Sequence, residues 1–202
     1  DAPRLRHGLP PDLGAPVVDL ADGAVTLQSG ERVSAEQIVV ATDGTTAARL
    51  LPALPPVSWR HVTCLYFAAP ASPLAAPRLA LNGSGTGLVN NVAVMSDVAP
   101  GYAPPGQALV SVSMLKDAGG DDASAAAQVQ AELAGWFGAP VREWRWLRSY
   151  RIARALPVRW PLERTAPVSV RPGVWTAGDF LATPSIQGAM ESGEAAADAA
   201  MA

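Results

Sequence analysis

A carboxylate and the start of a helix lie close together near the end of the chain, and both could hold a polar ligand. Residues 174–177 form a short apolar run that predicts a buried strand, and Gly178-Asp179 follows it directly. An aspartate in that place would set its carboxylate at the carboxyl edge of a sheet. A ligand with several hydroxyl groups would find a hydrogen-bond acceptor there.

The residues that follow, 184–193, predict the first turns of a helix with few bulky side chains. The free backbone N–H groups and the positive end of the helix dipole would point at whatever lies there. Amides near Ile186 and Gln187 could donate to a carbonyl-bearing ligand, and Gly188 and Gly193 would allow a close approach. The alternative is a purely structural strand, loop and helix, in which the carboxylate only caps and the glycines serve packing.

Elements in the first fifty residues must help to position this site. Residues 17–20 and 24–27 are apolar runs on either side of Asp22-Gly23, a pair typical of a hairpin turn. The run from Ile38 to Ala41 is apolar on both faces and predicts a buried strand, after which Asp43 can cap a short helix. This part of the chain is therefore predicted to be β-rich and then helical.

The rest of the chain predicts strands with two longer helices. From Asp122 to Phe137 apolar residues recur at helical spacing, Asp121-Asp122 is typical of an N-cap, and Gly138 ends the helix. The last helix is predicted to have Thr183 as its N-cap and Pro184 at its first position. Further strands are predicted at 59–69, 79–81, 89–95, 109–115 and, as one long strand or two, 141–156.

The end of the chain resembles a known family. Gly-Asp, a short loop and then Ser-Ile-x-Gly-Ala-x-x-Ser-Gly-x-x-Ala-Ala, within residues 178–197, is similar to the C-terminal FAD motif of the flavin amine oxidase and phytoene desaturase superfamily. The run from Ala15-Pro16-Val17 to Thr42 is similar to that family's run from its adenine-contacting valine to its "VVxAT" strand. Taken alone, that second run is also what a core strand would show.

The resemblance implies a set of cofactor-binding residues. They are Val17, Thr42, Gly178, Asp179, Ile186, Gln187 and Gly188. The aspartate would bind the ribityl hydroxyls, and the first amides of the last helix would face the pyrimidine end of the flavin ring. The backbone of the valine would lie near the adenine, and the threonine would lie near the cofactor loop.

The resemblance also implies a fold class and a division into domains. The expected class is α+β, from an α/β parent: a truncated FAD-binding domain of residues 1–50 and 170–202, and a mostly antiparallel substrate domain of residues 51–169 with a packed helix. The family's Gly-x-Gly-x-x-Gly unit does not occur before Val17, and the glycines at 83–87 have the wrong spacing and predict a β-turn. We expect the missing N-terminal part of the same protein to complete the site, and this chain alone to bind FAD poorly.

The implied activity is that of an FAD-dependent oxidoreductase, which would transfer a hydride from an organic substrate to flavin N5. The sequence identifies no catalytic residue, and its one lysine, Lys116, is expected in an exposed loop. Pro184 and Ser185 stand where an aromatic side chain that binds amines would be wanted. An apolar, desaturase-like substrate is therefore favoured over a primary amine. The alternative is a non-catalytic ligand-binding or assembly module that never holds flavin.

Composition excludes several other classes of protein. The net charge of −3 and a pI near 5.3 argue against a nucleic-acid binder. Arginines recur every third residue from Arg142 to Arg154, but on a strand this spacing alternates between faces, so no single basic face is expected. The aromatic and apolar residues between them are expected to share one face as a core or tunnel wall: Trp144, Trp146, Tyr150 and Ile152.

The remaining counts bear on metals, redox state and membranes. Cys64 is the one cysteine, which excludes an intramolecular disulfide and a multi-cysteine zinc site, and two histidines leave little for a histidine-rich metal site. No apolar run of about 20 residues occurs, so no membrane-spanning segment is predicted and a cytoplasmic location is expected. The oligomeric state cannot be inferred from the sequence.

Overall fold

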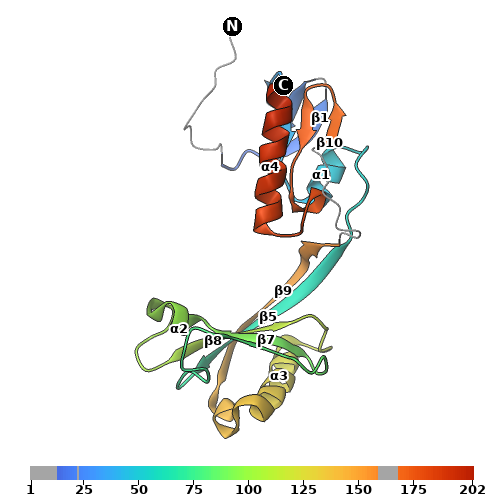
Figure 1. Ribbon diagram of the computed structural model, residues 1–202. Helices are drawn as coiled ribbons and strands as arrows, with labels where there is room; N and C mark the ends of the chain where they lie inside the picture. The colour runs from blue at the N-terminus through green and yellow to red at the C-terminus, as the bar shows by residue number, and fades with distance from the viewer. Residues whose placement is uncertain (1–12, 22, 159–167) are drawn as a thin grey trace. The chain divides into compact units, whose positions relative to one another are not determined.

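The structure, a computed structural model, describes residues 13–21, 23–158 and 168–202 (Figure 1). The chain divides into two compact units. Unit 1 comprises Asp1–Ser58 and Pro157–Ala202, and unit 2 comprises Trp59–Leu156. Helices and mostly antiparallel strands build both, which confirms the α+β class. That residues 1–50 and 170–202 form part of an FAD-binding domain, and residues 51–169 a substrate domain, stays a prediction.

The first sheet of unit 1 is a small antiparallel meander. β1 (Val17–Ala21) pairs with β2 (Ala24–Leu27), which confirms the hairpin predicted from Asp22-Gly23, although Asp22 itself lies outside the described residues. β3 (Arg32–Ser34), which the sequence did not predict, continues the sheet beside β2. The Gly23 φ angle of 69° is a left-handed conformation that suits glycine at such a turn.

The second sheet of unit 1 joins segments from the two ends of the chain. Its strand order is β10 (Val168–Arg171), β11 (Val174–Thr176), β4 (Ile38–Val40). β10 and β11 are antiparallel, whereas β11 runs parallel to β4 with Thr176 opposite Val40. The two strands of this parallel pair therefore end at the same edge of the sheet.

Two helices and a short 3₁₀ turn complete unit 1. α1 (Gly44–Leu50) begins after Asp43, whose carboxylate accepts hydrogen bonds from the first turn, as predicted. η3 (Asp179–Leu181) follows β11, and α4 (Ile186–Met201) ends the chain (Figure 1). The buried core of the unit draws on β1, β4, α1 and the segment after it, β11 and η3: Leu20, Val40, Ala47, Leu50, Leu51, Leu54, Val174, Phe180 and Leu181.

The predicted start of the last helix is wrong by two residues. Ser185, and not Thr183, is the N-cap of α4, and its hydroxyl accepts a hydrogen bond from the N–H of Gly188 at 3.0 Å. Pro184 consequently precedes the helix instead of opening it. Thr183 lies in the loop between η3 and α4, and its backbone packs directly against Gly188 in the first turn of α4.

Unit 2 is built on one five-stranded sheet. Its order is β6 (Leu79–Leu81), β7 (Val89–Val94), β8 (Ala108–Met114), β5 (Trp59–Ala69), β9 (Arg145–Pro157). The pairs β6–β7, β7–β8 and β8–β5 are antiparallel. All of these strands are close to the predicted runs. The last differs because the predicted segment 141–156 begins with a 3₁₀ helix, η2 (Ala139–Glu143).

α3 (Asp122–Phe137) packs on one face of this sheet (Figure 1). Its N-cap is Asp121, as predicted, and Gly138 follows its last residue with a φ of 79°. Val129 and Leu133 of the helix share a buried cluster with Leu65 and Phe67 of β5. Two short helices, α2 (Met95–Val98) and η1 (Pro100–Tyr102), connect β7 to β8.

The expectation that Trp144 and Tyr150 share a face is wrong. Trp144 precedes β9, is buried, and lies 6.0 Å from Phe67 between ring centroids on the face covered by α3. Tyr150 lies 5.8 Å from Tyr66, which is next to Phe67 in β5 and so points to the opposite face. Trp144 is the C-cap of η2 and not part of the strand. Trp146 of β9 also packs against the cluster under α3, so the predicted alternation already fails between Trp146 and Tyr150.

Candidate functional site

The parallel pair β4–β11 sets the geometry of the candidate site. The N–H of Ala177 donates to the carbonyl of Val40 at 3.0 Å, and the buried hydroxyl of Thr176 donates to the same carbonyl at 3.3 Å. The chain leaves β4 toward Thr42 and leaves β11 toward Asp179. Both predicted residues therefore follow the same edge of the sheet, the edge where ligands bind in open α/β sheets.

Gly178 makes the tight connection from β11 to η3. A β-carbon at this position would overlap the ring of Phe180, coming within 2.7 Å of its Cδ1. The N–H of Gly178 donates to the hydroxyl of Ser192 on α4 at 3.0 Å. This bond links the loop after β11 to the last helix, so it fixes the residue before Asp179 against α4.

Asp179 presents a half-buried carboxylate at the start of η3. Its backbone carbonyl accepts a hydrogen bond from the N–H of Ala182 at 3.3 Å. Among the described residues, none donates to its side chain. An ionised carboxylate has room for several donors, and burying one without partners is unfavourable. Asp179 is thus an acceptor that can serve a ligand.

The first turn of α4 presents hydrogen-bond donors that a ligand could use. Ser185 uses its hydroxyl and its carbonyl to accept hydrogen bonds from Gly188 and Ala189. The N–H groups of Ile186 and Gln187 have no acceptor in the part of the chain that the structure describes, as expected for the first positions of a helix. Ile186 is 83% exposed, so its side chain is not packed over these amides.

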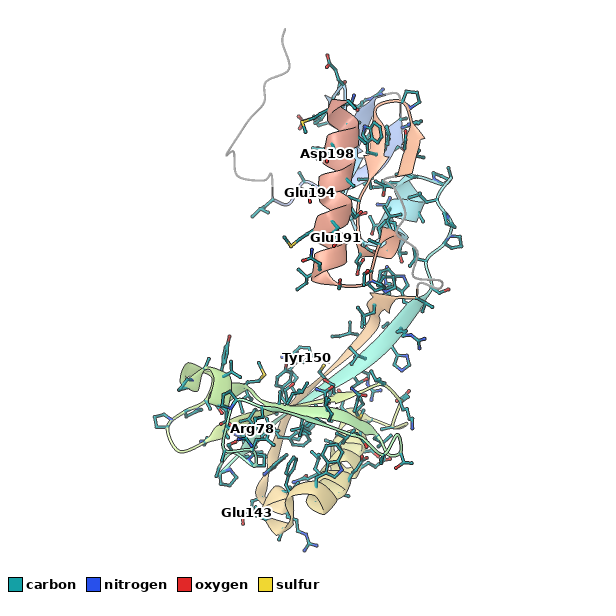
Figure 2. The ribbon with its side chains drawn as sticks, viewed as in Figure 1. Arg78, Glu143, Tyr150, Glu191, Glu194 and Asp198 are labelled. Atoms are coloured by element: carbon teal, nitrogen blue, oxygen red, sulfur yellow. The ribbon has the colours of Figure 1, made fainter. Side chains whose placement is uncertain are left out.

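The first turn of α4 carries no acidic side chain. Glu191, Glu194 and Asp198 lie further along the helix (Figure 2). Gln187 donates from Nε2 to Glu191 at 3.3 Å. The partial positive charge of the helix N-terminus is therefore not offset within the first turn and would favour an electron-rich group there.

Gly188 is required by a close approach of two backbone segments. A β-carbon at this position would overlap the carbonyl oxygen of Thr183 and come within 2.8 Å of its carbonyl carbon and 2.9 Å of its nitrogen. Gly193 differs, since a β-carbon there would meet nothing within 4 Å. The close approach predicted for both glycines therefore occurs at Gly188, against the protein's own loop.

Val17 and Thr42 are the two predicted residues from the first part of the chain. Val17 opens β1, and its carbonyl accepts a hydrogen bond from Arg49 of α1 at 3.3 Å. Thr42 is exposed, and its hydroxyl donates to the carbonyl of Asp43 at 3.2 Å. No hydrogen bond connects either residue to the group around Asp179 within the described chain.

Gly44, the first residue of α1, packs against η3, a contact that the sequence analysis did not predict. A β-carbon on Gly44 would come within 2.9 Å of the ring of Phe180 and 2.7 Å of Val57. The first turn of α1 therefore packs directly on η3. A glycine directly after an N-cap aspartate is a sequence feature that could have pointed to this contact.

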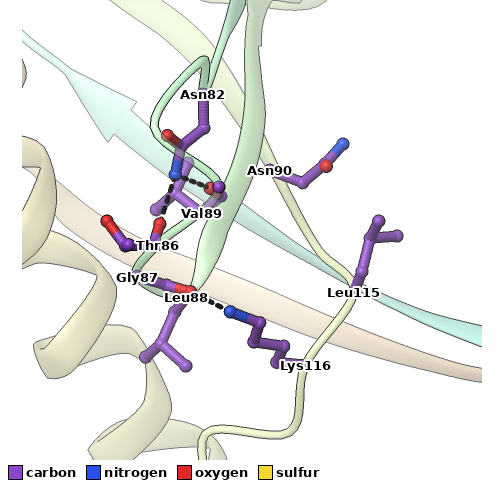
Figure 3. Close-up of a pocket in the computed structure, with 9 residues that line it drawn as sticks. Asn82, Thr86, Gly87, Leu88, Val89, Asn90, Leu115 and Lys116 are labelled. Atoms are coloured by element: carbon purple, nitrogen blue, oxygen red, sulfur yellow. Dashed lines mark hydrogen bonds between the residues drawn. The ribbon is translucent and has the colours of Figure 1, made fainter.

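The glycine loop at 83–87 and Lys116 belong to a separate pocket in unit 2 (Figure 3). The side-chain amide of Asn82 donates to the carbonyls of Thr86 and Val89 and holds the loop as a turn between β6 and β7, as predicted. Lys116 is exposed and donates to the carbonyl of Gly87 at 3.3 Å. Its ammonium thus stabilises a loop.

Within residues 13–21, 23–158 and 168–202, histidine, cysteine, aspartate and glutamate side chains do not gather in groups of three that could hold a metal ion. None of the helices in the same ranges is long and apolar enough to cross a membrane.

Comparison with known proteins places most of the chain in one family. The model of the flavin-containing amine oxidoreductase family matches residues 3–201. Among curated proteins, none is similar enough in sequence to match this chain.

Solved structures share the fold at low sequence identity. A protein named PF1083 from Pyrococcus furiosus is 14% identical with a TM-score of 0.62, and the match covers 91% of this chain and 45% of that one. An oxidoreductase from Methanosarcina mazei is 14% identical with a TM-score of 0.64, over 93% and 48% of the two chains. A reduced UDP-galactopyranose mutase is 14% identical with a TM-score of 0.63, over 82% and 41%. The chain thus spans less than half the length of these proteins.

Proposed function

Because this chain belongs to the family of flavin-containing amine oxidoreductases, we propose that it is part of an FAD-dependent oxidoreductase. Unit 1 holds the ribityl chain and the pyrimidine edge of the flavin, and unit 2 carries the surface on which an apolar organic substrate lies. Bound FAD supplies an acceptor for a hydride from that substrate.

One observation carries the proposal: three polar groups around the start of α4 lack partners in the described chain. They are the carboxylate of Asp179 and the N–H groups of Ile186 and Gln187. A carboxylate suits the hydroxyl groups of a ribityl chain, and two adjacent amide donors suit the carbonyl and ring nitrogen of a flavin's pyrimidine edge. The positive end of the helix adds a favourable field for that edge.

The other predicted residues have supporting roles in this proposal. Gly178 and Gly188 let the loop pack closely enough to bring the carboxylate and the amides together. The backbone of Val17 lies beside the adenine, and its carbonyl retains a second lone pair after bonding to Arg49. Thr42 lines the edge of the sheet at which Asp179 also lies.

The test of this proposal is the retention of FAD by a full-length protein that contains this chain. Asp179→Ala removes the acceptor, whereas Asp198→Ala removes an exposed carboxylate on the same helix and serves as the matched control. We expect Asp179→Ala to weaken FAD binding about tenfold or more, because charged hydrogen bonds to the ribityl hydroxyls are lost. The control should retain FAD as well as the unchanged protein does.

Two outcomes count against the proposal at different levels. Equal FAD retention by Asp179→Ala and the unchanged protein would refute the role of the carboxylate. A full-length protein without yellow absorbance, and without FAD released on denaturation, would refute the enzyme and favour a flavin-free binding or assembly module.

A further inference from the structure

The sheet of unit 2 has two faces of different character. Leu65 and Phe67 of β5 lie buried under α3, whereas Cys64 and Tyr66 alternate with them and point to the other side. We call that other side the open face. It consists of the side chains that share a register row with Cys64 or Tyr66, together with Tyr150 and Arg148 of β9.

Strand register gives the arrangement of the open face. One row contains Leu79, Ala93, Ser111 and Tyr66 in order across four strands, and the next contains Leu81, Asn91, Ser113 and Cys64. The side chains in the middle of both rows are small. They lie between exposed leucines on β6 and the tyrosines of β5 and β9, a width of about 14 Å at the usual strand spacing. This surface has short, mostly polar side chains in its middle and apolar or aromatic side chains at both margins, and it suits a flat or extended molecule with apolar ends.

Arg148 places a positive charge beside Tyr150 at one side of this surface. The guanidinium carbon of Arg148 lies 5.3 Å from the centre of the Tyr150 ring, and that ring meets the edge of Tyr66. A cation held over an aromatic ring is partly fixed in position. Arg148 therefore shares the open face with the tyrosines.

The charges of the sheet are all of one sign. The five strands contain no aspartate or glutamate, and β5 and β9 together carry five arginines. Of these, Arg151 points to the side of α3, where it forms ion pairs with Asp117 and Asp122. Among the described residues, no carboxylate forms an ion pair with Arg148. The arginines spaced three apart thus divide between the faces, and the open face receives an arginine without a carboxylate partner.

We propose that the open face binds an apolar substrate that carries a carboxylate, with Arg148 as the residue that recognises it. The inference rests on the proposed function, since it assigns the substrate class of the same enzyme. A guanidinium binds a carboxylate through two parallel hydrogen bonds. A cationic amine would meet five strands that carry no acidic side chain and a positive charge beside Tyr150, and is disfavoured.

The test compares three ten-carbon probes of different charge by calorimetric titration of the 202-residue chain: decanoate, N-methyldecanamide and decyltrimethylammonium. We expect decanoate to bind about tenfold more tightly than the neutral amide, and the cation to bind most weakly. Raising the salt concentration should reduce the advantage of decanoate, because the contact is at the surface.

Variants assign this preference to one residue. Arg148→Gln should bring decanoate to the affinity of the amide, Arg148→Lys should keep part of the preference, and Arg142→Gln, an exposed arginine in η2, should leave it unchanged. Circular dichroism establishes that each variant is folded. Amide shifts of Ser111 and Ser113 in NMR spectra report that the probes lie on the open face.

Several results would overturn the inference. They are equal affinity for decanoate and the amide, tighter binding of the cation, binding of none of the three, or a preference that survives Arg148→Gln. The last would be expected if Arg148 only keeps the edge strand β9 from pairing with other chains. This titration contains no FAD, so its result does not depend on flavin binding. If the chain prefers decanoate but the full-length protein fails to bind FAD, only the proposed function is refuted.

Discussion

Two glycines of α4 offer a matched test of the packing that positions the candidate site. Replacing either with alanine removes backbone freedom and favours the helix by about 0.5–1 kcal/mol. At Gly193 a β-carbon meets nothing within 4 Å, so this gain should appear in full. At Gly188 the β-carbon overlaps the backbone of Thr183, which cannot move aside as the end of a flexible side chain could.

The difference between the two variants isolates the cost of that overlap, since the helix-propensity gain is common to both. Overpacking of this kind costs about 1–3 kcal/mol. We therefore expect Gly193→Ala to stabilise α4 and Gly188→Ala to be less stable than Gly193→Ala by that amount.

The assay is native-state amide exchange at Ala196, a buried residue in the interior of α4. Two compact units can unfold separately, so exchange at one helix is more informative than a global melt. Exchange should be about fivefold or more faster in Gly188→Ala than in Gly193→Ala. Equal exchange rates in the two variants would refute the close approach of Gly188 and Thr183.

Two further predictions concern unit 2. Glu132 accepts hydrogen bonds from the backbone N–H groups of Leu88 and Val89, where β7 begins, at 2.7 and 3.3 Å. Glu132→Gln should destabilise the unit by about 1–3 kcal/mol in urea unfolding, with Glu143→Gln, an exposed change, as the control. The N–H of Gly119 and the guanidinium of Arg151 hold the pKa of Asp117 below its ordinary value. The stability that this carboxylate contributes is therefore present above the ordinary aspartate pKa of about 3.9 and is lost as pH falls through the lower value in the folded protein. The advantage of the unchanged protein over Asp117→Asn should shrink below about pH 4, and an advantage constant from pH 2.5 to 6 would contradict this.

Local chemistry made much of the fold predictable. Asp43 and Asp121 cap their helices as expected because an aspartate before a helical run satisfies amides a few residues away. β5 was predicted with its exact limits because its side chains alternate between buried and half-buried. The final helix was misplaced because Thr183, Pro184 and Ser185 are all plausible first residues, and only the contact with Gly188 selects Ser185.

What the sequence could not supply were contacts between distant segments. β10 and β3 are short and acquire their structure from pairing with β11 and β2. In the candidate site, the carboxylate and the helix amides were predicted from a local motif. The bond from Gly178 to Ser192 and the packing of Gly44 on Phe180 arise from tertiary structure, which no periodicity encodes.

In the proposed function, Asp179 and the start of α4 receive the flavin. An NMR titration of the 202-residue chain with FAD tests it most directly, since it reports each amide. At millimolar FAD the largest shifts should occur at the N–H groups of Ile186, Gln187 and Gly178, and at micromolar FAD binding should be far from stoichiometric. Shifts confined to other residues, or none at millimolar FAD, would contradict the account.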